Sequence, residues 1–445
     1  MAKPLIAALR RPAASTVVFW SLTTLFGIWM ILQYRNQWYL IIDDWTMLGS
    51  RIEHLNRFGV DDFLLRRHNE HLMAGMTLWN AGLAEIFGLR SYTPWVVTVQ
   101  MGNIFVAWIV YRFMQVLDVP RLIAAVLAPL FMIWGPFTTI SYWAPESIFV
   151  ICLALVMLNY WLATTGEPSI KREVLGTIFS ALAIFIHSVC VAVIPVLVVV
   201  LLYRRRWRSS IIASIPILLY GLWFVTYQRL PSSNRWTGTG SGDIYQERNL
   251  QIFFSFSWKT LARMVWWHST PAAALGVTLM VAAGTVIAWR RGGVQRTLVM
   301  SSLAAALVYM AGFAWSRGFV TMNIFKQDPP SRYAAVVALL LMPIALVPIG
   351  WAAARLHATP DAFHHVTRGL GVALLVLVIV ASVRMREDND DAVIPYASQT
   401  RARILSLADD PMLYSYERDE FVFGDNSWLD LTIRDVIRFK ERGWL

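Results

Sequence analysis

The sequence predicts an all-α, polytopic membrane protein. Of its 445 residues, 57% are hydrophobic and 15% are charged, and the mean hydropathy is +0.51. Soluble domains carry about 25% charged and about 45–50% apolar residues. Apolar runs long enough to cross a bilayer recur along most of the chain. These three observations set the fold class before any motif is considered.

The apolar runs predict the membrane spans. The run 174–203 has basic residues at both ends, so we expect it to cross twice or to form a re-entrant pair folding near His187. With that run counted twice, we expect about 11 transmembrane helices. The runs lie at 16–34, 93–115, 121–140, 146–163, 174–203, 210–228, 270–289, 298–316, 332–352 and 367–383.

Basic clusters such as Arg204–Arg208 separate the runs and predict the orientation, because Lys and Arg favour cytoplasmic loops. The N-terminus is then cytoplasmic, and the first outer loop (35–92) and the C-terminus are extracytoplasmic. This distribution also accounts for the net charge of +11, so we do not expect nucleic-acid binding. Both cysteines, Cys152 and Cys190, fall in apolar runs, so no disulfide framework is predicted.

Two further segments complete the expected architecture. Residues 72–88 carry apolar side chains at a 4-3-4-3 spacing, which favours a helix lying on the membrane surface within the first outer loop. Residues 384–445 contain 9 Lys and Arg against 13 Asp and Glu. We therefore divide the chain into a transmembrane module (1–383) and a small extracytoplasmic C-terminal cap (384–445).

An acidic pair, Asp43 and Asp44, follows directly after the first span. Two close carboxylates raise one pKa by mutual repulsion, which suits a general base, although two solvated loop residues would have the same sequence. Other polar motifs also fall in outer loops: "RRHNEHL" (66–72), "SYWAPES" (141–147) and "KQDPPSRY" (326–333). No phosphate-binding nucleotide motif is present. An activated substrate at this surface would arrive within the lipid, on a polyprenyl-phosphate carrier.

The order of these motifs resembles that of the GT-C superfamily of membrane glycosyltransferases. "DDW" resembles its acidic first-loop motif, and "HNEH" resembles the later part of that loop. "APES" and "SRY" resemble the starts of two later spans. The resemblance implies an inverting hexosyl- or pentosyltransferase in a bacterial plasma (inner) membrane. The enzyme would be surrounded by membrane lipids. It would transfer the sugar of a polyprenyl-phosphate donor to a glycan, lipid or protein acceptor. The resemblance places the base role on Asp43, with Asp44 orienting it.

A departing polyprenyl phosphate gains charge and needs fixed cations. Arg332 is our first choice because it opens a late span, although an arginine there can also snorkel to the interface. Further candidates for the donor phosphate are Arg66, Arg67 and Arg263. For substrate binding we expect Asn69, Glu70, His71, Trp143, Glu146, Trp267, His268 and Tyr333. Glu146 could instead cap a helix start, and the tryptophans could be interfacial anchors.

A divalent metal is a second interpretation of "HNEH". His68 and His71 share a helical face at this spacing, but Glu70 does not, so we favour hydrogen bonding to sugar or phosphate over metal binding. Two other functions stay open. A lipid-linked sugar flippase or transporter would place charged or broken helices near the membrane midplane. A membrane acyltransferase would use a histidine deep in the spans, and His187 is available for that role.

Overall fold

The computed structural model describes residues 12–41, 43–68, 71–230, 250–266, 269–319, 329, 331–356, 361–417, 420–423 and 431–445. Across these ranges, regular structure is helical apart from two isolated bridges. Seven of the described helices are long and apolar enough to span a membrane. The protein is thus an all-α, multi-pass membrane protein, as expected, and the count of about 11 spans stays a prediction.

The first two long helices form an antiparallel pair. In α2 (Pro12–Tyr34) the ring of Phe19 stacks on Tyr111 of α7 (Thr93–Val116), with centroids 4.7 Å apart. At the other end, the ring centroids of Tyr34 and Tyr142 are 4.0 Å apart. The Tyr92 hydroxyl donates a 3.0 Å hydrogen bond to the Tyr142 carbonyl. The loop joining the two helices therefore leaves and re-enters the bundle at the same end.

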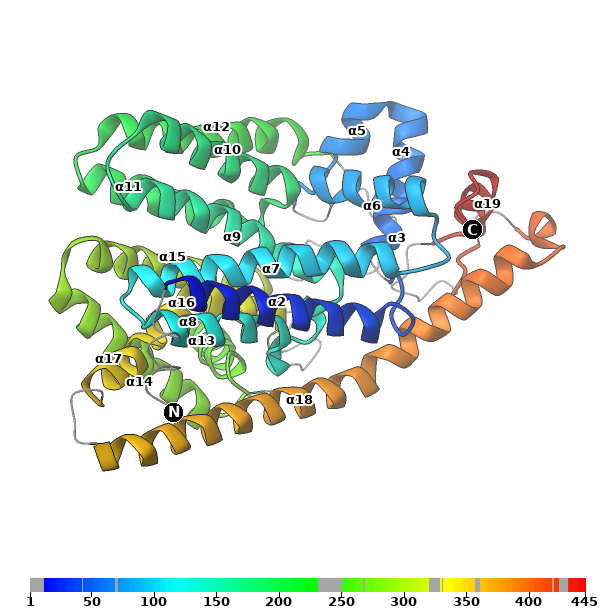
Figure 1. Ribbon diagram of the computed structural model, residues 1–445. Helices are drawn as coiled ribbons and strands as arrows, with labels where there is room; N and C mark the ends of the chain where they lie inside the picture. The colour runs from blue at the N-terminus through cyan, green and yellow to red at the C-terminus, as the bar shows by residue number, and fades with distance from the viewer. Residues whose placement is uncertain are drawn as a thin grey trace.

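Four short helices fill this loop and lie together beside the bundle end (Figure 1). They are α3 (Asp43–Leu48), α4 (Ser50–Phe58), α5 (Val60–Leu65) and α6 (Ala74–Phe87). Since α6 lies within a loop that returns to the same end, the prediction that 72–88 does not cross agrees with the structure.

The stretch 121–140, which we expected to be one transmembrane helix, is not a continuous helix. That stretch is α8 (Arg121–Leu127) followed by three 3-10 turns, η1 (Pro129–Ile133), η2 (Gly135–Phe137) and η3 (Thr139–Ser141). Pro129 and Pro136 lack the backbone N–H that an α-helix needs and clash with the preceding turn. The apolar composition was correctly recognised, but the two prolines break the helix.

The run 174–203 goes out and back, as expected. After α9 (Ala144–Thr164), α10 (Ile170–Ile186) ends at His187, and η4 (Ser188–Val193) with α11 (Ile194–Tyr203) returns. The start of α10 and the end of α11 lie close together, where Arg206, three residues after α11, pairs with Glu173 of α10 at 2.8 Å. The apex reaches the first outer loop, where the Ser188 amide donates a 2.9 Å hydrogen bond to the Leu72 carbonyl.

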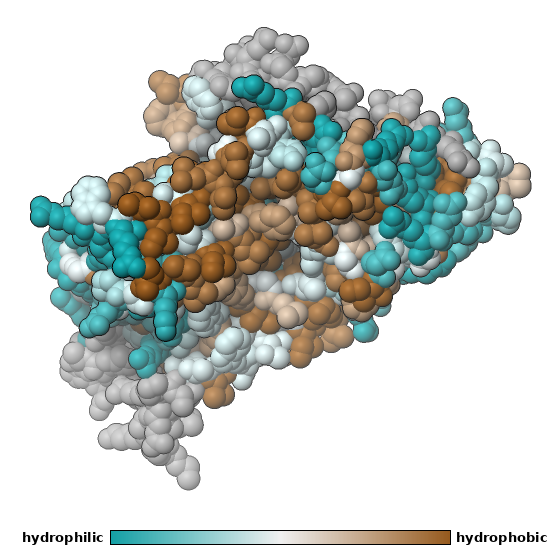
Figure 2. Space-filling model, turned by 90° about the horizontal axis from the view of Figure 1, so that it is seen from above, coloured by the Kyte–Doolittle hydropathy of each residue, from teal (hydrophilic) through white to brown (hydrophobic). Residues whose placement is uncertain are grey.

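The remaining helices complete the bundle. They are α12 (Trp207–Tyr227), α13 (Leu250–Arg263), α14 (Pro271–Arg291), α15 (Gly293–Phe319), α16 (Ser331–Ala345) and α17 (Val347–Leu356). On α12, Ile211, Leu218 and Leu222 are exposed by 66% or more, as a lipid-facing surface requires. Figure 2 shows hydrophobic side chains across the middle of one face and hydrophilic ones gathered toward its ends.

The chain after α17 returns to the first outer loop. The 49-residue α18 (Asp361–Asp409) runs along the outside of the bundle, and η7 (Leu413–Ser415) and α19 (Ile433–Glu441) follow (Figure 1). The expected boundary between residues 383 and 384 therefore lies inside α18. Phe439 of α19 stacks on Trp45 at 6.1 Å, and the Leu89 amide donates to the Trp444 carbonyl. The C-terminal segment thus packs on the first-loop helices.

Candidate active site

Asp43 and Asp44 are adjacent in the chain but lie in different environments. Asp43 begins α3; its side chain is 35% exposed, and its Oδ1 lies 3.2 Å from Nε2 of the buried His68. Asp44 is fully buried, and its Oδ2 accepts 3.1 Å hydrogen bonds from the Ile41 amide and from Nε1 of Trp143. Asp43 and Asp44 are the first two residues of α3, and neighbouring positions of a helix face different sides, which accounts for this division.

Burial raises the pKa of Asp44 to about 7, and the neighbouring Asp43 charge adds to the effect. The two hydrogen bonds to Oδ2 oppose this shift because they favour the charged form. Oδ1 of Asp44 is buried and has no hydrogen-bond partner within the described ranges. Asp43 is therefore the carboxylate that a substrate can reach, and Asp44 is the carboxylate that the protein encloses.

A tight turn presents the two histidines of "HNEH". His68 and His71 exchange two backbone hydrogen bonds of 2.9 Å, while Asn69 and Glu70 between them lie outside the described residues. The His71 ring lies 4.8 Å from that of His187, and its Nδ1 is 3.4 Å from the Ser188 hydroxyl. Burial, with His68 close by, lowers the pKa of His71 to about 4. His71 is therefore neutral at pH 7.

The second interpretation of "HNEH" was a divalent metal site. Among the described residues, no group of three His, Cys, Asp or Glu side chains is arranged to hold a metal ion. His68 faces Asp43, and His71 faces His187 and Ser188, so the two imidazoles are engaged on different partners. Metal binding by His68 and His71 stays an untested prediction.

Arg332 reaches the site from the start of α16. Its Nη1 donates a 2.7 Å charge-assisted hydrogen bond to Oε1 of Glu146, in the first turn of α9. The other Glu146 oxygen accepts from the Thr139 hydroxyl. The positive charge of Arg332 is also among the causes that lower the pKa of His71. Two of the predicted residues, far apart in sequence, are therefore brought together beside the histidine turn.

Three other predicted arginines have different neighbours, whereas Tyr333 lies beside Arg332, whose guanidinium is 5.2 Å from the centre of its ring. Arg66 pairs with Asp62 at 2.7 Å within the loop, and Nε of Arg67 donates to the Leu230 carbonyl at the end of α12. Arg263 closes α13, next to Met264, whose carbonyl accepts from Trp134. Tyr333 is buried among aromatic rings, with Phe313 at 4.0 Å. Trp267 and His268 lie outside the described residues.

The structure adds a buried polar group that the sequence reading missed. On α18, Arg386 is buried and donates 3.1 Å hydrogen bonds to the Tyr34 hydroxyl and the Ser141 hydroxyl. Tyr34 in turn donates to Asp390. The sequence places Arg386 and Asp390 in the predicted extracytoplasmic cap (384–445). Their i, i+4 spacing on a continuing helix is the signal that could have identified this buried pair.

Comparison with known proteins supports the fold. No family model matches the chain, and no curated protein matches it by sequence. One solved structure resembles it: ArnT from Cupriavidus metallidurans, crystallised with undecaprenyl phosphate. The TM-score is 0.50 at 15% identity, covering 92% of this chain and 82% of ArnT. At this identity the comparison shows a shared fold, and that fold extends over nearly the whole of this chain.

Proposed function

We propose that this protein is an inverting glycosyltransferase that moves a sugar from a polyprenyl-phosphate donor to an acceptor hydroxyl on the extracytoplasmic side of the membrane. The observation that carries the proposal is the half-exposed Asp43 carboxylate, held by His68 at the end of the bundle where α9 and α16 also begin. The fold is shared with ArnT, whose crystal structure contains undecaprenyl phosphate.

Asp43 is the general base in this account. Its carboxylate takes the proton of the acceptor hydroxyl as that oxygen forms a bond to the anomeric carbon. The bond between the anomeric carbon and the phosphate oxygen breaks, and its electron pair leaves with the polyprenyl phosphate. A single displacement inverts the anomeric centre and requires no covalent enzyme intermediate, in contrast to a retaining two-carboxylate reaction.

His68 positions Asp43. Its Nε2 at 3.2 Å can donate to Oδ1 and so fix the orientation of the carboxylate that takes the acceptor proton. The ring is buried, so its orientation is fixed by packing. Asp44, directly beside Asp43, anchors the start of α3 through the Ile41 amide and Trp143. His68 is a positioning residue, and Asp44 fixes the backbone from which Asp43 projects.

Arg332 stabilises the leaving phosphate. A guanidinium has five N–H donors. One on Nη1 is used by the hydrogen bond to Glu146, and Tyr333 takes a further side-chain hydrogen bond. The remaining donors can bind phosphate oxygens bidentately, as arginine does at phosphate sites. The position of Arg332 at the start of an apolar helix suits a phosphate at headgroup depth, with the polyprenyl chain in the lipid.

The proposal includes the orientation, with 11 spans, a cytoplasmic N-terminus and an extracytoplasmic C-terminus. The acceptor is a glycan, lipid or protein hydroxyl, and the donor sugar is a hexose or pentose. The test is to incubate the purified protein with a panel of polyprenyl-phosphate sugars and measure released polyprenyl phosphate. Release from at least one donor supports the proposal, whereas a lipid-linked sugar flippase would move donors across vesicles without cleaving any of them.

A further inference from the structure

The turn between α11 and α12 (203–208) lies at the end of the bundle opposite α3–α6 (Figure 1). It packs against the start of α10, where Glu173 accepts a 2.8 Å hydrogen bond from Arg206. The segments 165–173 and 203–208 together contain six Lys and Arg side chains but only two acidic ones. The structure describes every residue of both segments, so each of these charges can be followed to its partner.

Three of the six basic side chains are used within the fold, at the end of α9. Arg204 and Arg206 donate to the carbonyl groups of the last two residues of that helix. Arg172 donates a 3.1 Å hydrogen bond to the hydroxyl of Thr165, the residue that follows it. The last carbonyls of a helix have no partner within the helix, and basic side chains can satisfy them. These three arginines are therefore structural.

The other three basic side chains are Lys171, Arg205 and Arg208. All three are exposed, and none forms an ion pair or a side-chain hydrogen bond with another residue in the part of the chain that the structure describes. Unpaired Lys and Arg side chains at a membrane surface attract anionic lipids. The turn thus presents positive charge that the protein itself leaves uncompensated.

The backbone of Arg205 is in the left-handed region, with φ at +58°. This conformation brings the Cβ atom of an L-residue close to the following carbonyl oxygen, whereas glycine adopts it without that cost. At the ends of α6, α14 and α19 a glycine takes it. The other described non-glycine residue with positive φ is Asp118, of a type that tolerates it better. An arginine at this strained position favours a role for its side chain.

Aromatic and apolar side chains surround Arg205. Tyr203 and Trp207, two residues to either side, are 81% and 64% exposed. Exposed tyrosine and tryptophan rings are typical of the headgroup level of a membrane. Leu202 and Ile211 are also exposed and continue into the lipid-facing surface of α12. Positive charge at headgroup depth beside a lipid-facing surface suits a ligand that has both an anionic group and acyl chains.

We propose that Arg205 and Arg208, with Lys171 of the neighbouring helix, bind the phosphodiester group of an anionic glycerophospholipid, whose acyl chains lie against α12. A guanidinium can bind two phosphate oxygens at once. A zwitterionic phospholipid has the same phosphate but carries its own cation, so the site should discriminate against it. The proposed orientation places this lipid in the cytoplasmic leaflet. Binding itself depends neither on that orientation nor on glycosyl transfer.

The test is native mass spectrometry of the full-length protein in detergent, titrated with dioleoyl-phosphatidylglycerol or with dioleoyl-phosphatidylcholine. The wild type should bind its first phosphatidylglycerol about 10-fold or more tightly than phosphatidylcholine. Arg205→Gly and Arg208→Gln should each weaken phosphatidylglycerol binding about 5-fold, the effect of one basic side chain at an anionic membrane surface, and leave phosphatidylcholine binding unchanged. Arg205→Gly should not lower the apparent Tm, because glycine suits this backbone conformation.

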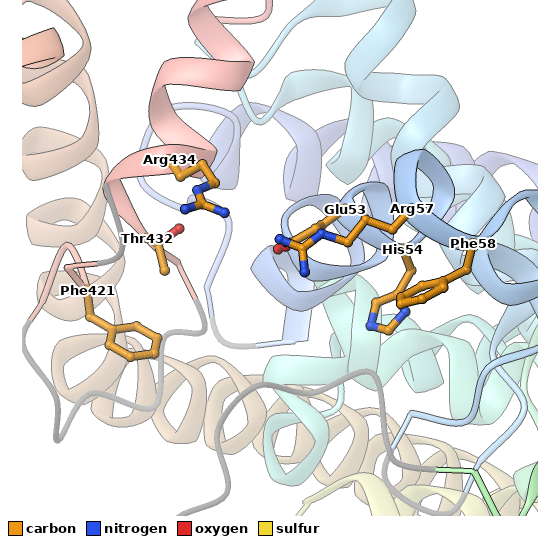
Figure 3. Close-up of a pocket in the computed structure, with 7 residues that line it drawn as sticks. All are labelled: Glu53, His54, Arg57, Phe58, Phe421, Thr432 and Arg434. Atoms are coloured by element: carbon orange, nitrogen blue, oxygen red, sulfur yellow. The ribbon is translucent and has the colours of Figure 1, made fainter. Parts of the chain in front are cut away.

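Two exposed arginines away from the turn provide matched controls. Arg121 begins α8, just after α7 ends, at the same end of the bundle. Arg57 lies at the opposite end, where it lines a pocket beside α4 (Figure 3). Arg121→Gln and Arg57→Gln should bind phosphatidylglycerol as the wild type does.

Three results would overturn the proposal. The first is equal affinity of the wild type for the two lipids. The second is a loss of binding in Arg121→Gln as large as that in Arg205→Gly, which would indicate a diffuse effect of net charge. The third is displacement of bound phosphatidylglycerol by inorganic phosphate at the same concentration, which would indicate a site for a free anion.

Discussion

Trp143 donates a 3.1 Å hydrogen bond from its indole nitrogen to Asp44, across 99 positions of the chain. The contact joins the first outer loop to the residue that precedes α9, the helix that carries Glu146. The same short segment meets α18, where Arg386 donates to the Ser141 hydroxyl. The acidic pair, the Arg332–Glu146 pair and the C-terminal helix are therefore linked through residues 141–146.

The burial of Asp44 predicts a stability that depends on pH. Its pKa rises from 3.8 to about 7 on folding, so the folded protein binds this proton more tightly than the unfolded chain. Stability from this group is therefore present at low pH and is lost as pH rises from about 4 to about 7, by on the order of 4 kcal/mol. In Asp44→Asn the apparent Tm should fall less over this interval. Equal pH dependence of Tm in both proteins would contradict the buried, protonatable Asp44.

His68 should act through Asp43 and not through general folding of the loop. His68→Ala removes the 3.2 Å partner of Asp43 and should lower kcat by about 10-fold to 100-fold, a part of the effect expected for a general base itself. His54→Gln is the matched control, because His54 pairs with Asp62 in the same loop. Matching activities for the two variants would remove His68 from the mechanism.

A double-mutant cycle on Arg332 and Glu146 should separate the structural role of Arg332 from its role in donor binding. Glu146 is only 7% exposed, so Arg332→Met removes the cationic partner of a nearly buried carboxylate and should destabilise the protein by about 3–5 kcal/mol. Adding Glu146→Leu should restore the apparent Tm, because the buried negative charge is then removed as well. The KM for donor should stay raised in the double variant, because the phosphate has lost its guanidinium. Recovery of donor KM together with Tm would make Arg332 a structural residue.

The orientation can be tested by single cysteines in a protein lacking Cys152 and Cys190. A cysteine at Ser398, an exposed position of α18, should react with a membrane-impermeant thiol reagent in intact cells. A cysteine at Arg208, exposed at the opposite end of the bundle, should react only after permeabilisation. The neighbouring Ser209 is unsuitable because it is buried and donates to Glu173. The reverse labelling pattern would place Asp43 in the cytoplasm.

Sequence reasoning found the parts of this molecule that depend on composition and periodicity. The apolar runs identified the membrane class, and the basic ends of 174–203 gave its return path. It failed where local chemistry overrides composition, as at Pro129 and Pro136, which break the expected helix into 3-10 turns. It also placed Arg386 in a small extracytoplasmic cap (384–445), since a charged run gives no sign that Arg386 is buried against Tyr34.

The members of the candidate site were proposed from the sequence, but their pairings could not be. The acidic pair was located from its place after the first span, yet nothing in the adjacent letters distinguishes the half-exposed Asp43 from the buried Asp44. That difference arises from contacts with His68 and Trp143, which tertiary packing alone supplies. Arg332 and Glu146 were proposed separately, and their ion pair likewise depends on how α9 and α16 pack.

The most direct test of the account is the turnover of Asp43→Asn. With a polyprenyl-phosphate sugar that the wild type cleaves, this variant should bind donor normally but release polyprenyl phosphate at least about 10²–10⁴-fold more slowly, because the general base is lost. Asp44→Asn, which keeps Asp43, should retain measurable turnover. Wild-type release by Asp43→Asn, alongside an inactive Asp44→Asn, would contradict the assignment of Asp43 as the catalytic base.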